Sequence, residues 1–192
     1  IRGDFGPAMT LLGTETVSKV SSAELAVIPL FLLMCSFATV GGLSADLYRI
    51  AHALIGHIRG GLAVATIGGC AGFGAICGSS VATATTMTRI ALPEMMKRNY
   101  SERLATGSIA AGGTLGMLIP PSIILVLYGV LTEQFVKTLF VAALLPGLLA
   151  VALHVVTIMI IVRLRPELAS SGDRQPWSET LRALRDGWTA VA

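Results

Sequence analysis

Four long windows of this sequence contain no Asp, Glu, Lys or Arg: residues 25–45, 60–88, 104–132 and 138–162. They cover 104 of the 192 residues, so all 25 charged side chains lie in the remaining 88. Apolar stretches of about 18 or more uncharged residues are typical of membrane-spanning helices, because a bilayer core is about 30 Å thick. This distribution excludes a soluble globule, a disordered chain and a nucleic-acid-binding protein. It predicts an all-α integral membrane protein with the lipid bilayer as its surroundings.

Two of the windows have the length and composition of ordinary transmembrane helices, predicted over 23–42 and 138–163. Between them, apolar residues recur at spacings of three and four along 43–59, with charged residues on the other face. This pattern predicts an amphipathic arm helix that lies in the membrane interface. We expect residues 1–22 to form a loop with short helical turns. Residues 164–192 are predicted as a polar loop followed by the start of another helix.

The window 60–88 is too long for one straight crossing and too short for two. Seven glycines occur between Gly60 and Gly78, and Ser79 and Ser80 follow directly. We therefore predict a re-entrant helical hairpin over 61–96, with its tip at 77–80. Non-helical backbone at membrane depth is tolerated only where protein or a water-filled cavity satisfies it, so such a tip is a candidate functional site.

A single spanning helix with glycines used for close packing is the alternative interpretation of this window. The bias of Lys and Arg does not decide between the two, because it places 11 on one side of the membrane and 3 on the other with either topology. The bias supports a membrane topology and leaves both interpretations open.

The window 104–132 contains a second interruption. Three glycines and two adjacent prolines between Gly112 and Pro121 cannot lie in one continuous helix. We predict a discontinuous transmembrane helix over 103–131, made of two half-helices, 103–115 and 121–131. Gly116 is expected to end the first half-helix and Pro121 to open the second.

Interrupted helices have a recognised chemical use in secondary transporters. The end of one half-helix offers free carbonyl groups to a cation, and the start of the next offers N–H groups to an anion. The hydroxyls of Ser79, Ser80 and Thr83 lie at or one turn after the predicted tip. We therefore predict a Na⁺ site between the tip at 77–80 and the break at 112–117.

Other functions stay open at this point. An intramembrane hydrolase would use Ser79 or Ser80 as nucleophile and His154 as base. A structural membrane subunit would use its glycines for packing alone. The cysteines Cys35, Cys70 and Cys77 are expected to be buried free thiols.

Six stretches of the sequence are familiar: IPLFLLM (28–34), HIRGGLAVATI (57–67), GAICGSSVATATTM (74–87), ALPEMMKRNY (91–100), LATGSIAAGGTLGMLIPPSIILVLYGVLTEQ (104–134) and LFVAALLPGLL (139–149). Together they resemble the large permease subunit of tripartite ATP-independent periplasmic (TRAP) transporters of the dicarboxylate type. It covers about 1–190, and the tip followed by GGTLGMLIPPS is its most specific part. It implies that the chain is the N-terminal repeat of a protein with two inverted repeats, half of an elevator-type transporter, and cannot transport alone.

The resemblance also implies roles for residues of the tip and the break. Gly78, Ser79, Ser80 and Thr83 would form one wall of a Na⁺ site. The other wall would consist of Gly113, Thr114 and Gly116. The substrate-facing residues would be Ser79, Pro120, Pro121 and Ser122.

Function follows from the same resemblance. It implies a non-enzymatic permease in the bacterial inner membrane that imports organic acids, four-carbon dicarboxylates among them, by symport with Na⁺ and without a further cofactor. A periplasmic binding protein would deliver the substrate, and a small membrane subunit would complete the complex. The alternative is an ion-coupled organic-anion transporter of similar architecture that works without a binding protein.

Overall fold

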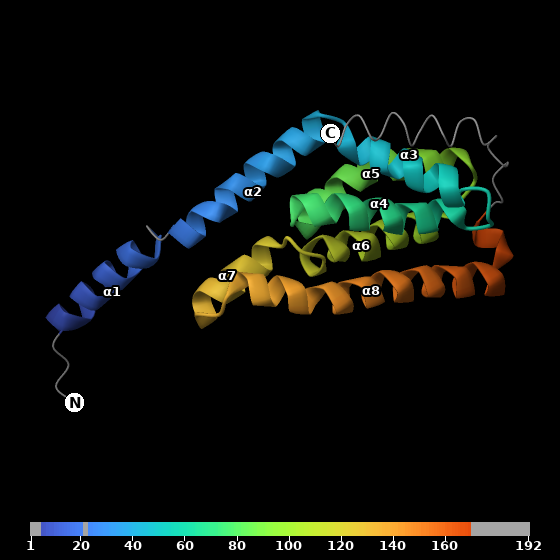
Figure 1. The fold of residues 1–192 in the computed structure, drawn as a ribbon. Coiled ribbons are helices and arrows are strands. Elements are labelled where there is room, and N and C mark those ends of the chain that lie inside the picture. Colours follow the sequence, from blue (N-terminus) through green and yellow to red (C-terminus); the bar gives the residue numbers. More distant parts are fainter. Residues whose placement is uncertain (1–4, 21–22, 170–192) are drawn as a thin grey trace.

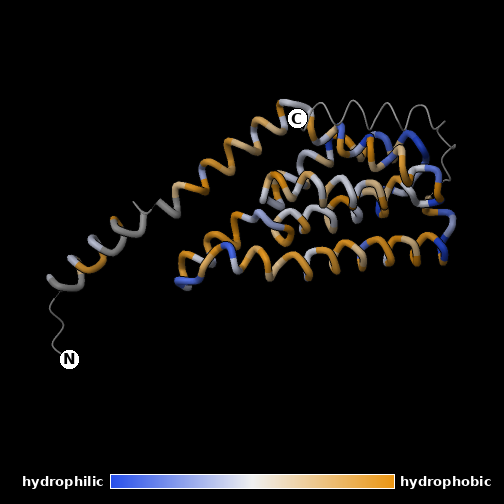
Figure 2. The backbone as a smooth tube through the Cα atoms, in the orientation of Figure 1, coloured by the Kyte–Doolittle hydropathy of each residue, from blue (hydrophilic) through white to orange (hydrophobic). Residues whose placement is uncertain are grey.

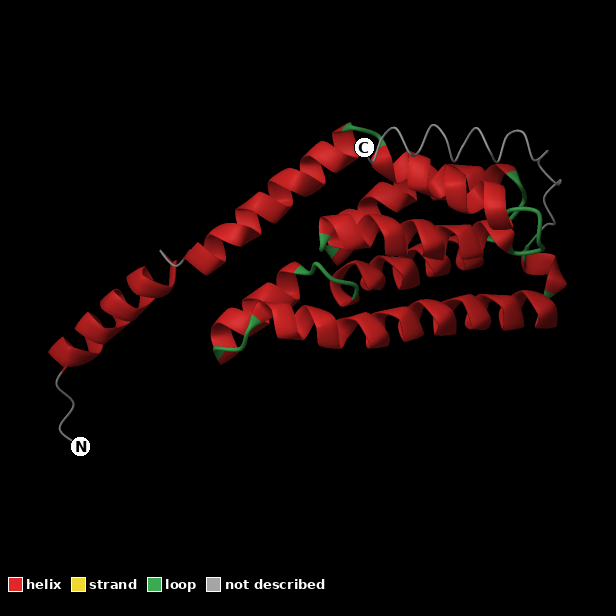
Figure 3. Cartoon of the chain, in the orientation of Figure 1, coloured by secondary structure: helices red, strands yellow, loops and turns green. Residues whose placement is uncertain are grey.

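A computed structural model describes residues 5–20 and 23–169 as helices joined by short connections (Figures 1 and 3). Within these ranges no residue forms a strand, and the predicted all-α fold is confirmed. The elements are α1 (Phe5–Val20), α2 (Ala23–Val40), α3 (Leu43–Ile55), α4 (Gly61–Cys77), α5 (Ser80–Lys97), α6 (Glu102–Leu118), α7 (Ile123–Thr132), α8 (Val136–Leu164) and the short 3₁₀ helix η1 (Pro166–Leu168).

Helices α3 to α8 form a bundle, and α1 and α2 extend away from it (Figure 1). Helix α4 is the centre of the bundle and packs against α3, α5, α6 and α8. Its first seven residues, 61–67, are all buried, and Phe73 further along has no exposed surface. The small residues of α4 let neighbouring helices approach closely, which is how helices associate where the solvent is lipid.

The predicted hairpin is present. Helix α4 ends at Cys77 and α5 begins at Ser80, against predicted arms of 61–76 and 81–96. Gly78 adopts the left-handed conformation (φ 64°) and donates its N–H to the carbonyl oxygen of Gly74 at 2.8 Å. This is a common way to end a helix, and glycine adopts it without steric cost. Ser79 then caps α5, so two residues reverse the chain.

The predicted discontinuous helix is also present, with α6 and α7 bent by 41° at the break. Two details of the prediction are wrong. Gly116 lies inside α6, which continues to Leu118 and ends where Ile119, in extended conformation, precedes Pro120. Pro121 does not open α7, because Ser122 is the N-cap and the helix starts at Ile123. The Pro120–Pro121 peptide bond is cis.

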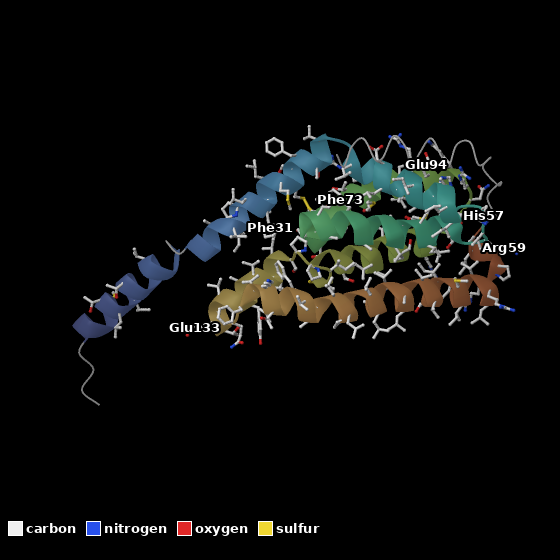
Figure 4. The ribbon with its side chains drawn as sticks, in the orientation of Figure 1. Phe31, His57, Arg59, Phe73, Glu94 and Glu133 are labelled. Atoms are coloured by element: carbon white, nitrogen blue, oxygen red, sulfur yellow. A yellow bond between two sulfur atoms is a disulfide. The ribbon has the colours of Figure 1, made fainter. Side chains whose placement is uncertain are left out.

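By length and composition, α8 alone could cross a membrane, and the described helices offer up to three crossings if each bent pair counts as one. The bent pairs are α6 with α7, and residues 26–40 of α2 with α3, which meet at 62°. Hydrophobic residues follow α2, α7 and α8 over most of their length (Figure 2). Hydrophilic side chains gather at the ends: His57 and Arg59 lie at one end of the bundle and Glu133 at the other (Figure 4).

The prediction of a loop over 1–22 is wrong for residues 5–20, which form helix α1. Residues 5–20 are helical, and the hydroxyls of Thr10 and Thr14 donate to the carbonyl oxygens of Gly6 and Thr10, four residues back, at 3.0 and 2.8 Å. These threonines therefore bond within the helix and do not compete with it. Of the predicted C-terminal segment, 166–168 form η1, whereas the helix start predicted further on lies outside the described residues.

The cysteine prediction is correct for one residue and wrong for two. Cys70 is a buried free thiol. Cys35 of α2 and Cys77 of α4 form a disulfide, with their Cα atoms 4.6 Å apart and a separation of 42 positions in the sequence. Sequence spacing alone could not reveal this pairing, because it depends on how α2 lies against the hairpin.

Candidate functional site

The hairpin tip and the helix break meet directly. The backbone N–H of Ile123, the first residue of α7, donates to the carbonyl oxygen of Gly78 at 3.2 Å. A Cβ atom at Gly78 would lie 2.9 Å from the carbonyl oxygen of Pro121 and 3.4 Å from the Cα of Ser122. The tip therefore contacts the backbone of the break without an intervening side chain. This junction is the candidate functional site.

Gly116 brings α6 against both arms of the hairpin. A Cβ at this position would lie 2.7 Å from Thr83 Oγ1 and 2.9 Å from the carbonyl oxygen of Ser79. On the other arm, a Cβ at Gly74 would lie 2.6 Å from the Cα of Gly116. The last turns of α6 are thus inserted between α4 and α5, with two oxygen atoms of the hairpin directed at Gly116.

Ser79 and Thr83 hold these two oxygen atoms in place. The Thr83 hydroxyl donates to the Ser79 carbonyl oxygen at 2.7 Å, and the Thr83 N–H donates to the same oxygen at 3.1 Å. The Ser79 Oγ accepts a hydrogen bond from the Ala82 N–H at 3.4 Å and so caps α5. Thr83 has no exposed surface, whereas Ser79 and Ser80 are half-buried. The hydroxyl oxygen of Thr83 still has lone pairs available for a further partner.

The residues of the second predicted wall, Gly113, Thr114 and Gly116, do not all lie on the same face of α6. Gly113 faces the hairpin, because a Cβ there would lie 2.7 Å from the Cβ of Ala84. Thr114 is exposed and donates its hydroxyl to the Ala111 carbonyl oxygen of its own helix at 2.7 Å. Residues one apart on a helix point in directions about 100° apart. The structure therefore brings Gly113 and Gly116 to the hairpin and leaves Thr114 off this contact.

Of the residues predicted to face the substrate, Ser122 has a structural role. It has no exposed surface, donates its hydroxyl to the Met117 carbonyl oxygen at 2.7 Å, and accepts from the Leu125 N–H at 3.5 Å. Ser122 thereby joins the end of α6 to the start of α7. Pro120 and Pro121 are half-buried in the connection between them.

Sequence reasoning missed the partners that complete the junction, namely Gly74, Ala84 and Ile123. Gly74 and Gly78 have the GxxxG spacing that is typical of close helix packing, yet the sequence does not indicate which helix packs there. Helical periodicity could have separated Thr114 from Gly113 and Gly116, because residues 113 and 116 share a face and 114 does not.

The histidine required by the hydrolase alternative has a local partner. His154 Nδ1 lies 2.6 Å from the Ala150 carbonyl oxygen, one turn back on α8. Among the described residues, no group of three or more His, Cys, Asp or Glu side chains could hold a metal ion. The oxygen atoms at the junction come from the backbone and from hydroxyl groups.

Four helix ends converge at this junction: the C-terminal ends of α4 and α6 and the N-terminal ends of α5 and α7. Helix C-termini carry partial negative charge and helix N-termini partial positive charge. Interrupted helices with facing ends inside an apolar, all-α body define the fold as that of a membrane transporter.

Comparison with known proteins agrees with the assignment to a membrane transporter. The family model for the DctM component of tripartite ATP-independent periplasmic transporters matches residues 3–192, and the chain belongs to this family. It is 44% identical over 138 residues to the C4-dicarboxylate TRAP transporter large permease protein of Pseudomonas aeruginosa, covering 72% of this chain and 32% of the relative.

Two further relatives extend the comparison. The C4-dicarboxylate TRAP transporter large permease protein of Vibrio cholerae is 38% identical over 83% of this chain and 35% of the relative. The ectoine TRAP transporter large permease protein of Halomonas elongata is 31% identical over 95% of this chain and 42% of the relative. The chain thus spans between about a third and two fifths of the length of these relatives. They are named as permeases and not as enzymes, which excludes the hydrolase alternative.

Proposed function

We propose that this chain supplies one ion-binding half of the large permease of a Na⁺-coupled TRAP transporter in the bacterial inner membrane. The observation that carries the proposal is the hydrogen bond between Ile123 and Gly78, which holds the hairpin tip against the helix break. Broken helices that meet inside the membrane bind ions and substrates in secondary transporters. Membership of the DctM family supports the assignment to a permease.

In this proposal the transported Na⁺ binds beside Gly116. The Thr83 hydroxyl and the Ser79 carbonyl oxygen are directed there, and the last turn of α6 supplies further carbonyl groups. Gly78 and Gly113 allow the close approach, and Ser80 opens the helix whose positive end faces the site. Thr114 is placed outside this set because its hydroxyl is directed away from the hairpin.

The proposed substrate is an organic acid, symported with Na⁺ and delivered by a periplasmic binding protein. A carboxylate is complementary to the positive ends of α5 and α7, which converge at the junction. Similarity to two C4-dicarboxylate permeases supports a dicarboxylate, and the similarity to an ectoine permease shows that such relatives differ in the substrate they are named for. The full permease would also contain a second repeat and bind a small membrane subunit.

The proposal is tested by uptake into proteoliposomes that contain the full-length permease and its partner subunits. Thr83→Val keeps the volume of the side chain and removes the hydroxyl, whereas Thr83→Ser keeps the hydroxyl. We expect Thr83→Val to raise the Na⁺ concentration for half-maximal uptake by about tenfold or more, because a Na⁺ ligand bound at membrane depth has no water to replace it. Thr83→Ser should remain within about threefold of the wild type.

Thr114→Val is the matched control, since it removes a hydroxyl of the same kind from the exposed face of α6. Its Na⁺ dependence should equal that of the wild type. If Thr83→Val and Thr114→Val have the same Na⁺ dependence, the ion site is not at Gly116. If uptake in all variants is independent of Na⁺, the proposed coupling is wrong.

A further inference from the structure

A groove of about 610 Å³ lies between α6 and α8, away from the junction of tip and break. Its walls are formed mainly by apolar side chains and small residues. They include Gly107 and Ala111 of α6 and Leu153, Ile158 and Ile161 of α8. His154 and Thr157 are the polar residues along α8, and both bond to carbonyl oxygens of their own helix at 2.6 and 2.7 Å. The groove therefore offers an apolar slot with few free polar groups.

One end of this groove carries positive charge. Arg103, in the first turn of α6, and Arg165, directly after α8, both line it. The two lie at the same end because the Ser101 N–H donates to the Leu168 carbonyl oxygen at 3.0 Å, which ties the start of α6 to η1. Within the described residues the ion pairs are Asp46–Arg49 and Glu94–Lys97, so neither arginine of the groove is neutralised by a carboxylate.

The same end of the bundle carries further basic residues. Arg59 donates its Nε–H to the Ala169 carbonyl oxygen at 3.3 Å, and Figure 4 shows Arg59 at the end of the bundle opposite Glu133. By the bias of Lys and Arg, this is the cytoplasmic side, where the leaflet contains anionic lipids. From Arg103 to Ala111 the groove follows α6 for about 12 Å, which is close to the thickness of one hydrocarbon leaflet.

We propose that this groove binds an anionic phospholipid of the cytoplasmic leaflet, with its phosphate on Arg103 and Arg165 and one acyl chain between α6 and α8. Charge and shape are both complementary. Two guanidinium groups that form no ion pair with a carboxylate of the described residues can bind phosphate in a bidentate manner, and the slot beneath them is apolar. A lipid held there would fill the space between α6 and α8, and so support the helix whose far end forms the junction.

The test uses the full-length permease with its partner subunits, purified in detergent and titrated with phosphatidylglycerol or phosphatidylcholine. The readouts are the bound lipid, counted by native mass spectrometry, and the thermal unfolding midpoint. Phosphatidylglycerol should bind more tightly and raise the midpoint, and its binding should weaken as salt is added. Arg103→Gln and Arg165→Gln should each lower its affinity about fivefold.

Two pairs of variants test separately how the arginine charge and the apolar slot contribute to lipid binding. Arg163→Gln removes the same charge from the same end of α8 but outside the groove, so it should leave the affinity unchanged. Gly107→Leu places a side chain where no atom lies within 4 Å of the Cβ, and should exclude the acyl chain. Its control is Ala110→Leu on the exposed face of α6.

The proposal is overturned if phosphatidylcholine binds as tightly as phosphatidylglycerol. It is also overturned if the double variant of Arg103 and Arg165 binds phosphatidylglycerol like Arg163→Gln. If the remainder of the permease chain fills the groove, Gly107→Leu will impair folding and leave lipid binding unchanged, and that result excludes a lipid.

Discussion

The backbone N–H of Ile123 donates to the carbonyl oxygen of Gly78 at 3.2 Å, and this bond joins two interruptions that lie about 45 residues apart in the sequence. Ile123 begins α7, and Gly78 is the residue after α4. Both groups are among those that a helix end leaves without an intrahelical partner. Each interruption therefore provides a hydrogen-bond partner for a backbone group of the other. A displacement of the hairpin tip must also displace the break.

Gly116→Ala is expected to damage this junction. The added Cβ would lie 2.7 Å from Thr83 Oγ1 and 2.9 Å from the Ser79 carbonyl oxygen, and the backbone oxygen cannot move away by a rotamer change. Overpacking of this kind costs about 1–3 kcal/mol, so the unfolding midpoint of the full-length permease should fall and uptake should be lost. Gly107→Ala on the same helix is the control, because nothing lies within 4 Å of its Cβ and it should be neutral or stabilising. Equal effects of the two substitutions would show that the contact at Gly116 is not tight.

Gly78→Ala should lower stability for two reasons, a strained backbone conformation and a steric clash, and Gly42→Ala measures the first of them alone. Gly78 has a φ of 64°, and its Cβ would lie 2.9 Å from the Pro121 carbonyl oxygen. Gly42, in the connection between α2 and α3, has a φ of 76° with open space around it. A left-handed alanine costs about 1–2 kcal/mol, so Gly42→Ala should lose about that much stability. Gly78→Ala should lose about 1–3 kcal/mol more stability than Gly42→Ala, because it also introduces a steric clash. Thermal unfolding of both variants measures the difference, and a Gly78→Ala no worse than Gly42→Ala would contradict the observed contact.

Much of the bundle could be predicted from the sequence because its signals are local. The absence of charge over 60–88 and 104–132 indicates membrane depth, and the Gly, Ser and Pro residues within these windows mark the interruptions. Gly78 and Ser79 form the tip because each acts on its own backbone, one by its positive φ and the other as an N-cap. Such effects do not depend on distant partners, which is why the arms of the hairpin were predicted to within about one residue.

What could not be predicted depends on packing between distant segments. Gly74–Gly78 and Gly112–Gly116 each have the GxxxG spacing that favours close helix packing, but only the fold shows that Gly74 and Gly116 pack against each other. Gly116 was expected to end its helix because glycine often does so. In the structure it lies within α6, where the hairpin requires a residue without a side chain. The pairing of Cys35 with Cys77 likewise follows from the position of α2 and not from any spacing in the sequence.

The disulfide between Cys35 and Cys77 can be tested by differential alkylation and mass spectrometry. In oxidised, denatured protein these two cysteines should resist alkylation until a reductant is added, whereas Cys70, a free thiol, should react once the chain is unfolded. Serine at both positions should lower the stability of the oxidised protein by about 2–4 kcal/mol, because the cross-link closes a loop across 42 residues. Cys70→Ser is the control that leaves the cross-link intact. If all three thiols are alkylated without reductant, the disulfide is absent.

Tyr100 connects the loop after α5 to the start of α4, and its removal should destabilise the bundle. Its hydroxyl oxygen accepts the Leu62 N–H at 3.3 Å, and the side chain is 2% exposed. Tyr100→Phe leaves that buried N–H without an acceptor, which costs about 1–3 kcal/mol. Burial raises the pKa of Tyr100 above its ordinary value of 10.0, so the phenol stays neutral in the folded protein while it ionises in the unfolded chain. The stability that the wild type gains from this tyrosine should therefore be constant below about pH 10 and decrease above it. Tyr128→Phe, at a side chain that is 53% exposed, is the control and should change the unfolding midpoint little. Equal midpoints for the two variants at neutral pH would show that the Leu62 N–H does not depend on Tyr100.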